Sequence, residues 1–75
     1  MNDDTTRALA AEVLAHLERH PDAADTAEGI QRWWLSDGGA YALADVERAL
    51  EHLVRMGSVS RRRLPDGRVL YAAVP

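Results

Sequence analysis

The chain has no cysteine, no phenylalanine and no lysine, and its only aromatic residues of the Phe, Trp and Tyr type are two tryptophans and two tyrosines in 75 residues. The absence of cysteine excludes disulfides and thiolate metal sites as sources of stability. A domain this small buries barely enough apolar surface to offset its conformational entropy. The core must therefore come from aliphatic side chains and the four aromatic residues, and we expect dimerisation as a supplement.

Long apolar runs are also missing. No stretch approaches the roughly 18 consecutive apolar residues of a membrane span, and the N-terminal sequence MNDDTTR is too acidic and polar for a signal peptide. We therefore expect a soluble cytoplasmic protein that has no membrane partner.

The motifs of enzymes are absent from the sequence. It has no Gly-rich phosphate loop, no nucleophile elbow and no paired carboxylates in a plausible cleft. We predict that the protein is not an enzyme, and that it binds no cofactor and no small-molecule ligand.

The charge is unevenly distributed along the chain. The formal net charge is −3, whereas nucleic-acid-binding domains are usually basic. Residues 1–51 contain eleven Asp and Glu against four Arg, a balance of −7, and residues 52–75 contain one Asp against five Arg, a balance of +4. Only the C-terminal third could therefore face a polyanion.

The first half of the chain has the spacing of two amphipathic helices. The first runs over about residues 5–19, with Thr5 or Thr6 as its N-cap, and Pro21 ends it. Residues 20–25 form a turn, and a second helix over about residues 26–35 starts at a capping box of Asp25 and Glu28 or at Thr26. Gly29 inside this helix predicts a close approach of another helix.

A third helix begins at Ala42 or Leu43, after a flexible connector over residues 36–40. Gly57 supplies the left-handed residue that ends it. Its apolar spacing predicts a buried stripe, which consists of Val46, Ala49, Leu50, Leu53 and Met56.

The last eighteen residues change to the period of β-strands. Residues 59–64 and 68–74 read as two strands around Pro65-Asp66-Gly67, which is a turn sequence typical of hairpins. With Asp66-Gly67 as a two-residue loop, Leu64 would pair with Val69 and Arg62 with Tyr71.

The order of helix, helix, turn, helix and hairpin resembles the winged-helix branch of the helix-turn-helix superfamily. The resemblance covers nearly the whole chain and depends on ordinary apolar and turn residues at matching positions: Ala27, Gly29, Ile30, Val46, Ala49, Leu50, Leu53, Gly57, Val59, Asp66, Gly67 and Tyr71. It implies an α+β, mostly α fold, a three-helix winged helix-turn-helix with a C-terminal two-stranded wing. We expect one domain over residues 1–75, with a frayed lead-in at 1–4, helices over 5–57 and the wing over 58–74.

The resemblance also implies a function. In winged-helix DNA-binding domains the third helix lies in the major groove, and the wing reaches a neighbouring backbone or minor groove. The chain would then be a small DNA-binding module of the transcription-regulator type, with double-stranded DNA as its partner. Carried over by position, the groove-facing residues are Ala42, Ala44, Asp45, Arg48 and His52, of which Arg48 and His52 would approach bases. The wing residues that would contact the DNA backbone are Arg61, Arg62, Arg63 and Arg68.

A protein-interaction module without DNA binding is the alternative. The start of the third helix reads AYALADVE, with Asp45 and Glu47 where DNA-binding members carry residues that contact phosphates. An edge strand also often carries positive charge simply to prevent edge-to-edge pairing, so the arginines of the hairpin need no ligand. Adjacent helical residues point about 100° apart, so either Trp33 or Trp34 belongs to the core. The other, at the core's edge, could anchor a homodimer or a larger protein partner.

One row of potential metal ligands occurs in the first helix. Glu12, His16 and His20 lie four residues apart, a spacing that is geometrically capable of holding a metal ion. No fourth ligand suggests itself, and a solvated row is the simpler interpretation. We predict no metal site.

Overall fold

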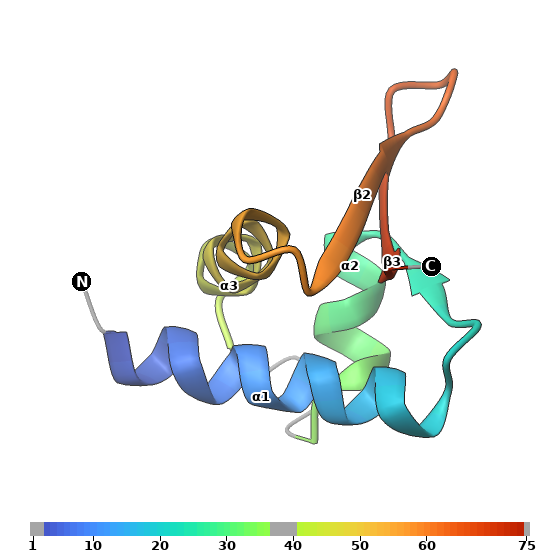
Figure 1. Cartoon of the computed structure of the whole chain (residues 1–75). Coiled ribbons are helices and arrows are strands. Elements are labelled where there is room, and N and C mark those ends of the chain that lie inside the picture. Colours follow the sequence, from blue (N-terminus) through green and yellow to red (C-terminus); the bar gives the residue numbers. More distant parts are fainter. Residues whose placement is uncertain (1–2, 37–40, 75) are drawn as a thin grey trace.

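The computed structural model describes residues 3–36 and 41–74, and the fold is α+β and mostly helical (Figure 1). The helical elements are α1 (Asp3–Arg19), α2 (Ala27–Gly29), which continues directly into the π-helical turn η1 (Ile30–Trp34), and α3 (Leu43–Arg55). The strands are β1 (Ala24–Asp25), β2 (Val59–Arg63) and β3 (Val69–Ala73), and they form one antiparallel sheet in the order β1-β3-β2. The predicted α+β, mostly helical class and the predicted order of helices and hairpin are confirmed, whereas the winged-helix assignment stays a prediction.

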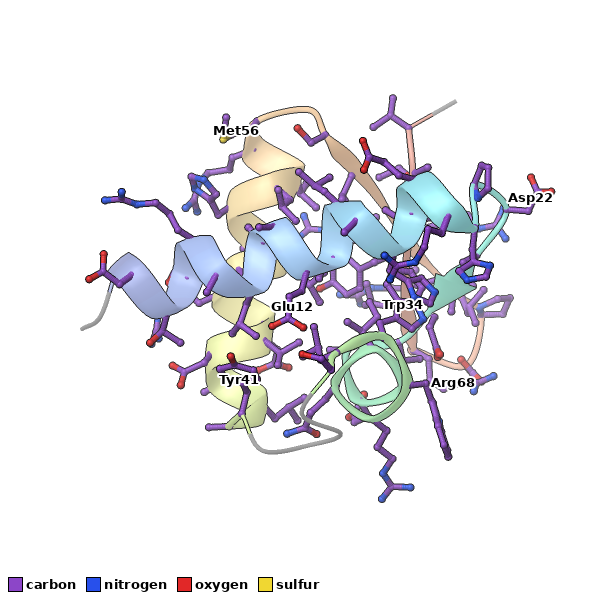
Figure 2. All side chains as sticks on the ribbon, turned by 90° about the horizontal axis from the view of Figure 1, so that it is seen from below. Glu12, Asp22, Trp34, Tyr41, Met56 and Arg68 are labelled. Carbon is purple, nitrogen blue, oxygen red and sulfur yellow. The ribbon has the colours of Figure 1, made fainter. Side chains whose placement is uncertain are left out.

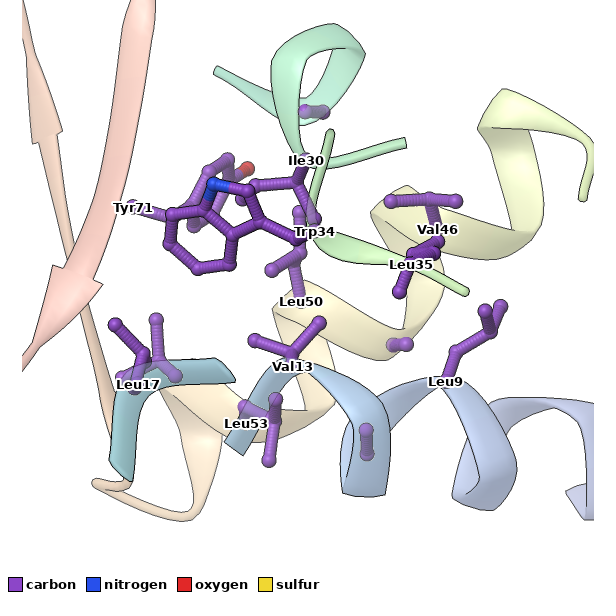
Figure 3. Close-up of a cluster of buried hydrophobic side chains, with 14 residues drawn as sticks. Leu9, Val13, Leu17, Ile30, Trp34, Leu35, Val46, Leu50, Leu53 and Tyr71 are labelled. Atoms are coloured by element: carbon purple, nitrogen blue, oxygen red, sulfur yellow. The ribbon is translucent and has the colours of Figure 1, made fainter. Parts of the chain in front are cut away.

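The core lies where α1, α2–η1 and α3 meet, and the base of the hairpin closes it (Figure 3). The hairpin contributes Val59 and Tyr71, and beyond this base it projects away from the helices (Figure 1). The buried hydrophobic residues are Leu9, Ala10, Val13, Leu17, Ala27, Ile30, Trp34, Leu35, Val46, Ala49, Leu50, Leu53, Val59 and Tyr71. No helix in the described ranges has the length and apolarity that crossing a membrane requires.

Helix α3 has the bounds that its sequence predicts. Its N-cap is Ala42, and Gly57 follows its C-cap with φ of +76°. The Ser58 N–H donates to the Leu53 carbonyl at 3.0 Å and the Gly57 N–H donates to the Val54 carbonyl at 3.0 Å. These two bonds form a Schellman motif, which satisfies the last carbonyls of the helix.

Met56 was wrongly assigned to the buried stripe of this helix. Its side chain is 65% exposed, while the other four predicted members of the stripe are buried. Met56 is the C-cap residue. The chain leaves the helical direction at Gly57, so Met56 lies at the end of the helix, beyond the buried part of the stripe.

Helix α1 begins at Asp3, so Thr5 and Thr6 lie inside the helix and do not cap it. The Asp4 carboxylate in the first turn favours this earlier start because it stabilises the positive end of the helix dipole. The predicted frayed lead-in at 1–4 is therefore wrong for residues 3 and 4, which are helical, and residues 1–2 lie outside the described residues. The end of the helix at Arg19 is as predicted.

The second helix starts at the predicted place. Thr26 is the N-cap, and its Oγ1 accepts from the Gly29 N–H at 3.2 Å, while the Asp25 carboxylate accepts from the Thr26 N–H at 2.8 Å. The atoms nearest to a Cβ built at Gly29 all belong to the Asp25 carboxylate, so the glycine leaves room for this side chain. The close approach of another helix at Gly29 stays a prediction. Four residues of the predicted connector, 37–40, lie outside the described residues.

A third strand was missed in the sequence. Residues 20–25 were predicted to be a turn, and the Ala23 N–H does close one by donating to the His20 carbonyl at 3.0 Å. The last two residues form β1, however, in which Ala24 pairs with Ala72 and Asp25 with Tyr71. Two residues are too few to show an alternating pattern, so only the partner strand identifies them.

The two strands of the hairpin are confirmed, but the predicted register is wrong by one residue. Arg61 pairs with Tyr71, Arg62 with Leu70 and Arg63 with Val69. The loop has three residues because the Leu64 N–H donates to the Arg68 carbonyl at 2.7 Å and the Gly67 N–H donates to the Leu64 carbonyl at 2.9 Å. With Gly67 at φ of +92°, this is a turn followed by a left-handed glycine, the usual three-residue hairpin loop. The shift exchanges the two faces, so that Arg61 and Arg63 lie on the face of Tyr71 and Arg62 lies on the other.

Candidate functional site

The exposed face of α3 carries an ion pair where DNA contacts were predicted. The Arg48 Nη1 lies 2.9 Å from the Asp45 Oδ1, one helical turn earlier, and both side chains are partly exposed. Such a surface pair contributes little to stability, but it places a carboxylate beside the cation that would have approached a base. His52 lies one turn further along the same helix and is half-buried.

A second ion pair joins α3 to the hairpin. The Arg61 Nη1 lies 2.5 Å from the Glu51 Oε2. The hydrogen bond to Glu51 and then the charge of Glu51 raise the pKa of Arg61. Burial, and next the charge of Glu51, raise the pKa of Tyr71, and Glu47 contributes in the same direction. Glu47 and Glu51 therefore both lie on the side of α3 that faces the hairpin.

The groove between α3 and the hairpin has mixed charge. Glu28 and Glu47 line it together with Arg68, and Val69 and Tyr71 contribute apolar surface. The Arg68 Nε lies 2.8 Å from the Asp66 Oδ2 at the hairpin tip. The Arg68 backbone and side chain both donate to this carboxylate and lower the pKa of Asp66. The groove is thus not a continuous positive surface.

The structure does not bring the six predicted DNA contacts together on one face. Arg48 and His52 lie on α3, and Arg61 and Arg63 lie on the face of the hairpin that looks toward Glu51. Arg62 lies on the opposite face of the sheet, beside Ser60, Leu70 and Ala72. Arg62 and Arg63 are exposed and, among the described residues, neither has a carboxylate within ion-pair distance.

The two tryptophans have opposite environments. Trp34 is 8% exposed and lies in the core with Ile30, Leu50 and Tyr71 (Figure 3). Trp33 is 74% exposed, more than any other large hydrophobic side chain in the described part of the chain. The prediction that the two indoles would separate into a core residue and an edge residue is confirmed, and Trp33 is the exposed one.

The imidazole of His16 stacks on the buried indole of Trp34. The two ring centroids are 4.4 Å apart and the ring planes lie 12° from parallel. The His16 ring also contacts the His20 ring, at a centroid distance of 4.7 Å. Figure 2 shows Trp34 against the C-terminal half of α1. Burial, followed by the charges of His20 and Arg19, lowers the pKa of His16.

The Glu12 carboxylate, the first member of the predicted histidine row, is occupied elsewhere. Its Oε1 accepts from both the backbone N–H and the Oγ of Ser36, at 2.9 Å each. Glu12 therefore ties the end of the second helical segment to α1. Within residues 3–36 and 41–74, no group of three or more His, Asp or Glu side chains has an arrangement that could hold a metal ion.

The sequence did not predict two of the contacts described above, the Arg61–Glu51 ion pair and the His16–Trp34 stack. The ion pair of Glu51 with Arg61 was not predicted, because this contact depends on the correct hairpin register. The stack joins residues on different helical segments, and a histidine near the end of α1 is the only sign of it in the sequence.

No family model matches this chain, and no curated protein matches it in sequence.

Proposed function

We propose that the chain is a winged-helix-like module that docks a protein partner. The layout supports the scaffold, because three helical segments precede a hairpin that joins a short third strand in an antiparallel sheet. The same scaffold can serve many functions, so the site must decide which one applies.

One observation carries the docking function: Trp33 is 74% exposed, whereas its neighbour Trp34 is buried in the core. Tryptophan is enriched among the anchors of protein interfaces because it buries a large area with few rotatable bonds. The helical turn that holds Trp33 is fixed from behind by the core residues Ile30 and Trp34. With this backbone fixed, a partner that covers the indole has to order only the side-chain torsions of Trp33.

The charges on α3 oppose insertion of this helix into DNA. Asp45, Glu47 and Glu51 would all approach phosphates, and Arg48 and Arg61 already neutralise two of these carboxylates. An insertion would either break these pairs or bring a carboxylate against the backbone of the nucleic acid, where like charges repel.

Binding to mixed-sequence duplex DNA across a salt series tests this function. We expect no measurable binding at about 50 mM salt, because the electrostatic term that dominates DNA affinity is absent from α3. The control is a variant with Arg61, Arg62 and Arg63 all changed to Ala. Wild-type binding that weakens steeply with salt, with a shallower slope in this variant, would contradict the docking function.

DNA binding through the wing alone is the second candidate. The specific observation in its favour is that Arg62 and Arg63 are exposed and have no carboxylate partner among the described residues. In this case the wing would supply phosphate contacts and α3 would contribute little. The same salt series distinguishes it, since the triple Ala variant would then lose most of the affinity.

A further inference from the structure

Strand β2 forms an edge of the sheet. The strand order is β1-β3-β2, so β2 pairs with β3 along one of its edges, and no described strand pairs with the other edge of β2. Its five residues, Val59–Arg63, carry three consecutive arginines. An open edge presents unpaired N–H and C=O groups that another extended segment can use.

The register shows which backbone groups point outward. The Leu64 N–H donates to the Arg68 carbonyl, and antiparallel partners alternate between hydrogen-bonded and non-hydrogen-bonded pairs. Counting back along the ladder, Arg62–Leu70 is a hydrogen-bonded pair, whereas Arg61–Tyr71 and Arg63–Val69 are not. The N–H and C=O groups of Arg61 and Arg63 therefore face the open edge.

The arginine side chains of β2 favour a negatively charged segment at this edge. Arg61 is already bound by Glu51, which leaves Arg62 and Arg63 as the two cations of β2 that have no carboxylate partner among the described residues. These two lie on opposite faces of the sheet because side chains alternate along a strand. Consecutive side chains of a neighbouring strand alternate in the same way, so two adjacent carboxylates would each meet one arginine.

Two other occupants fit this edge less well. A second copy of β2 would bring arginines opposite arginines, and like charges directly opposite each other destabilise a strand pair. A phosphate chain passing along one face of the hairpin could contact Arg63 or Arg62, but their opposite orientations prevent both from joining the same face.

We propose that the edge of β2 binds an extended acidic segment of a partner protein, which adds to the sheet as a fourth strand with two adjacent carboxylates beside Arg62 and Arg63. The inference goes beyond docking at Trp33, because the residues that surround Trp33 come from α1, η1 and the residues next to them and not from β2. It assigns a second binding surface and the chemistry of the segment that binds there. Backbone hydrogen bonds to Arg61 and Arg63 would supply affinity, and the two ion pairs would set the choice of partner.

The probe for this surface is the synthetic peptide acetyl-TVEEVT-amide, titrated into the whole isotope-labelled protein and followed by NMR. We expect the amide protons of Arg61 and Arg63 to shift and to exchange more slowly when the peptide is bound. The amide of Arg62 already points to β3 and serves as an internal reference. Changing both glutamates of the peptide to lysine should weaken binding by about tenfold or more, since an attractive pair becomes repulsive on both faces.

A charge exchange identifies the two arginines. The Arg62→Glu/Arg63→Glu variant should lose binding to the glutamate peptide and gain binding to acetyl-TVKKVT-amide. The matched control is Arg7→Glu/Arg32→Glu, which changes the net charge equally at two exposed positions in other elements. This control should bind the glutamate peptide as the wild type does. Loss of binding in the control to the same extent would overturn the assignment to the edge of β2.

A backbone-methylated glutamate peptide separates strand addition from attraction between charges alone. Methylation of the amides that face β2 removes hydrogen bonds and keeps both carboxylates, so binding should be lost. Equal binding of the methylated peptide, or no binding of the unmethylated one, would overturn strand addition. If duplex DNA also fails to bind, the docking function stands and only its acidic partner is wrong. Salt-dependent DNA binding that requires the arginines would instead overturn the docking function itself.

Discussion

The His16 imidazole covers one face of the Trp34 indole, with ring centroids 4.4 Å apart and an angle of 12° between the planes. This stack places a titratable ring from α1 against an aromatic side chain that belongs to the core. Charging the imidazole is disfavoured there by burial and by the positive charges of its neighbours, so the pKa of His16 lies below its ordinary value.

We expect the free energy of unfolding to fall as the pH is lowered from 7.5 through the ordinary histidine pKa to that of folded His16. The sign follows from linkage. A base with a depressed pKa in the folded state binds more protons when unfolded, so its neutral form stabilises the fold at higher pH and this contribution is lost as the pH falls. Urea unfolding at pH 7.5 and pH 5.5 would measure it. The His16→Gln variant should show a smaller change, and an equal change would contradict the assignment to His16.

Trp34→Ala and Trp33→Ala should have very different effects on stability. Removing the buried Trp34 should cost about 3–5 kcal/mol because it opens a cavity in the core. Removing the exposed Trp33 should change stability by no more than about 0.5 kcal/mol. Thermal or urea unfolding of the two variants measures the difference. A large loss on Trp33→Ala would show that this indole serves the fold, which would weaken its role as a docking anchor.

Gly29→Ala should not give the stabilisation that is usual inside a helix. Alanine gains about 1 kcal/mol over glycine in a helix interior, but its Cβ would displace the Asp25 carboxylate. The carboxylate would then lose its hydrogen bond from the Thr26 N–H. A double-mutant cycle with Asp25→Ala measures this coupling: with the carboxylate absent, Gly29→Ala should stabilise the protein. Equal effects in both backgrounds would contradict the contact.

Gly57→Ala should destabilise the protein by about 1–2 kcal/mol, because a left-handed backbone is unfavourable for residues with a Cβ. The added methyl group would meet no neighbour within 4 Å, so the cost would come from the backbone alone. Gly57→Asn is the matched control, since asparagine tolerates this conformation better. Unfolding curves for both variants would test it, and an alanine variant as stable as the asparagine variant would argue against the φ of +76°.

Local rules were sufficient to predict the helices. The apolar spacing of α3 and the glycine after it fixed both ends of that helix within a residue, because cap and stripe agree on the same bounds. The start of α1 shows where such rules stop: capping at Thr5 or Thr6 predicts a later start, whereas the structure begins the helix at Asp3.

Features that depend on distant partners were not accessible from sequence patterns. Strand β1 is defined only by its pairing with β3. The register of the hairpin turned on whether its loop contains two or three residues, and the Leu64–Arg68 bond decides for three. The one-residue difference in loop length determines which arginine contacts Glu51. The sequence could therefore indicate a basic hairpin, but not which of its arginines lie on each face. The sequence also separated the two indoles, but the packing of η1 was needed to assign Trp34 to the core.

The anchoring of the hairpin at its base has a consequence for its internal motion. Val59 and Tyr71 hold the base within the core, whereas Arg63, Pro65 and Gly67 are exposed. The outer part of the hairpin extends beyond the helices (Figure 1). Segments with few buried contacts open at a lower free energy than the rest of a protein. The hairpin therefore has a gradient of stability, and its outer half can open and close while the helices stay folded. A segment that binds the outer half would lose part of its affinity to ordering that half, whereas one that reaches the base would meet a backbone already in place.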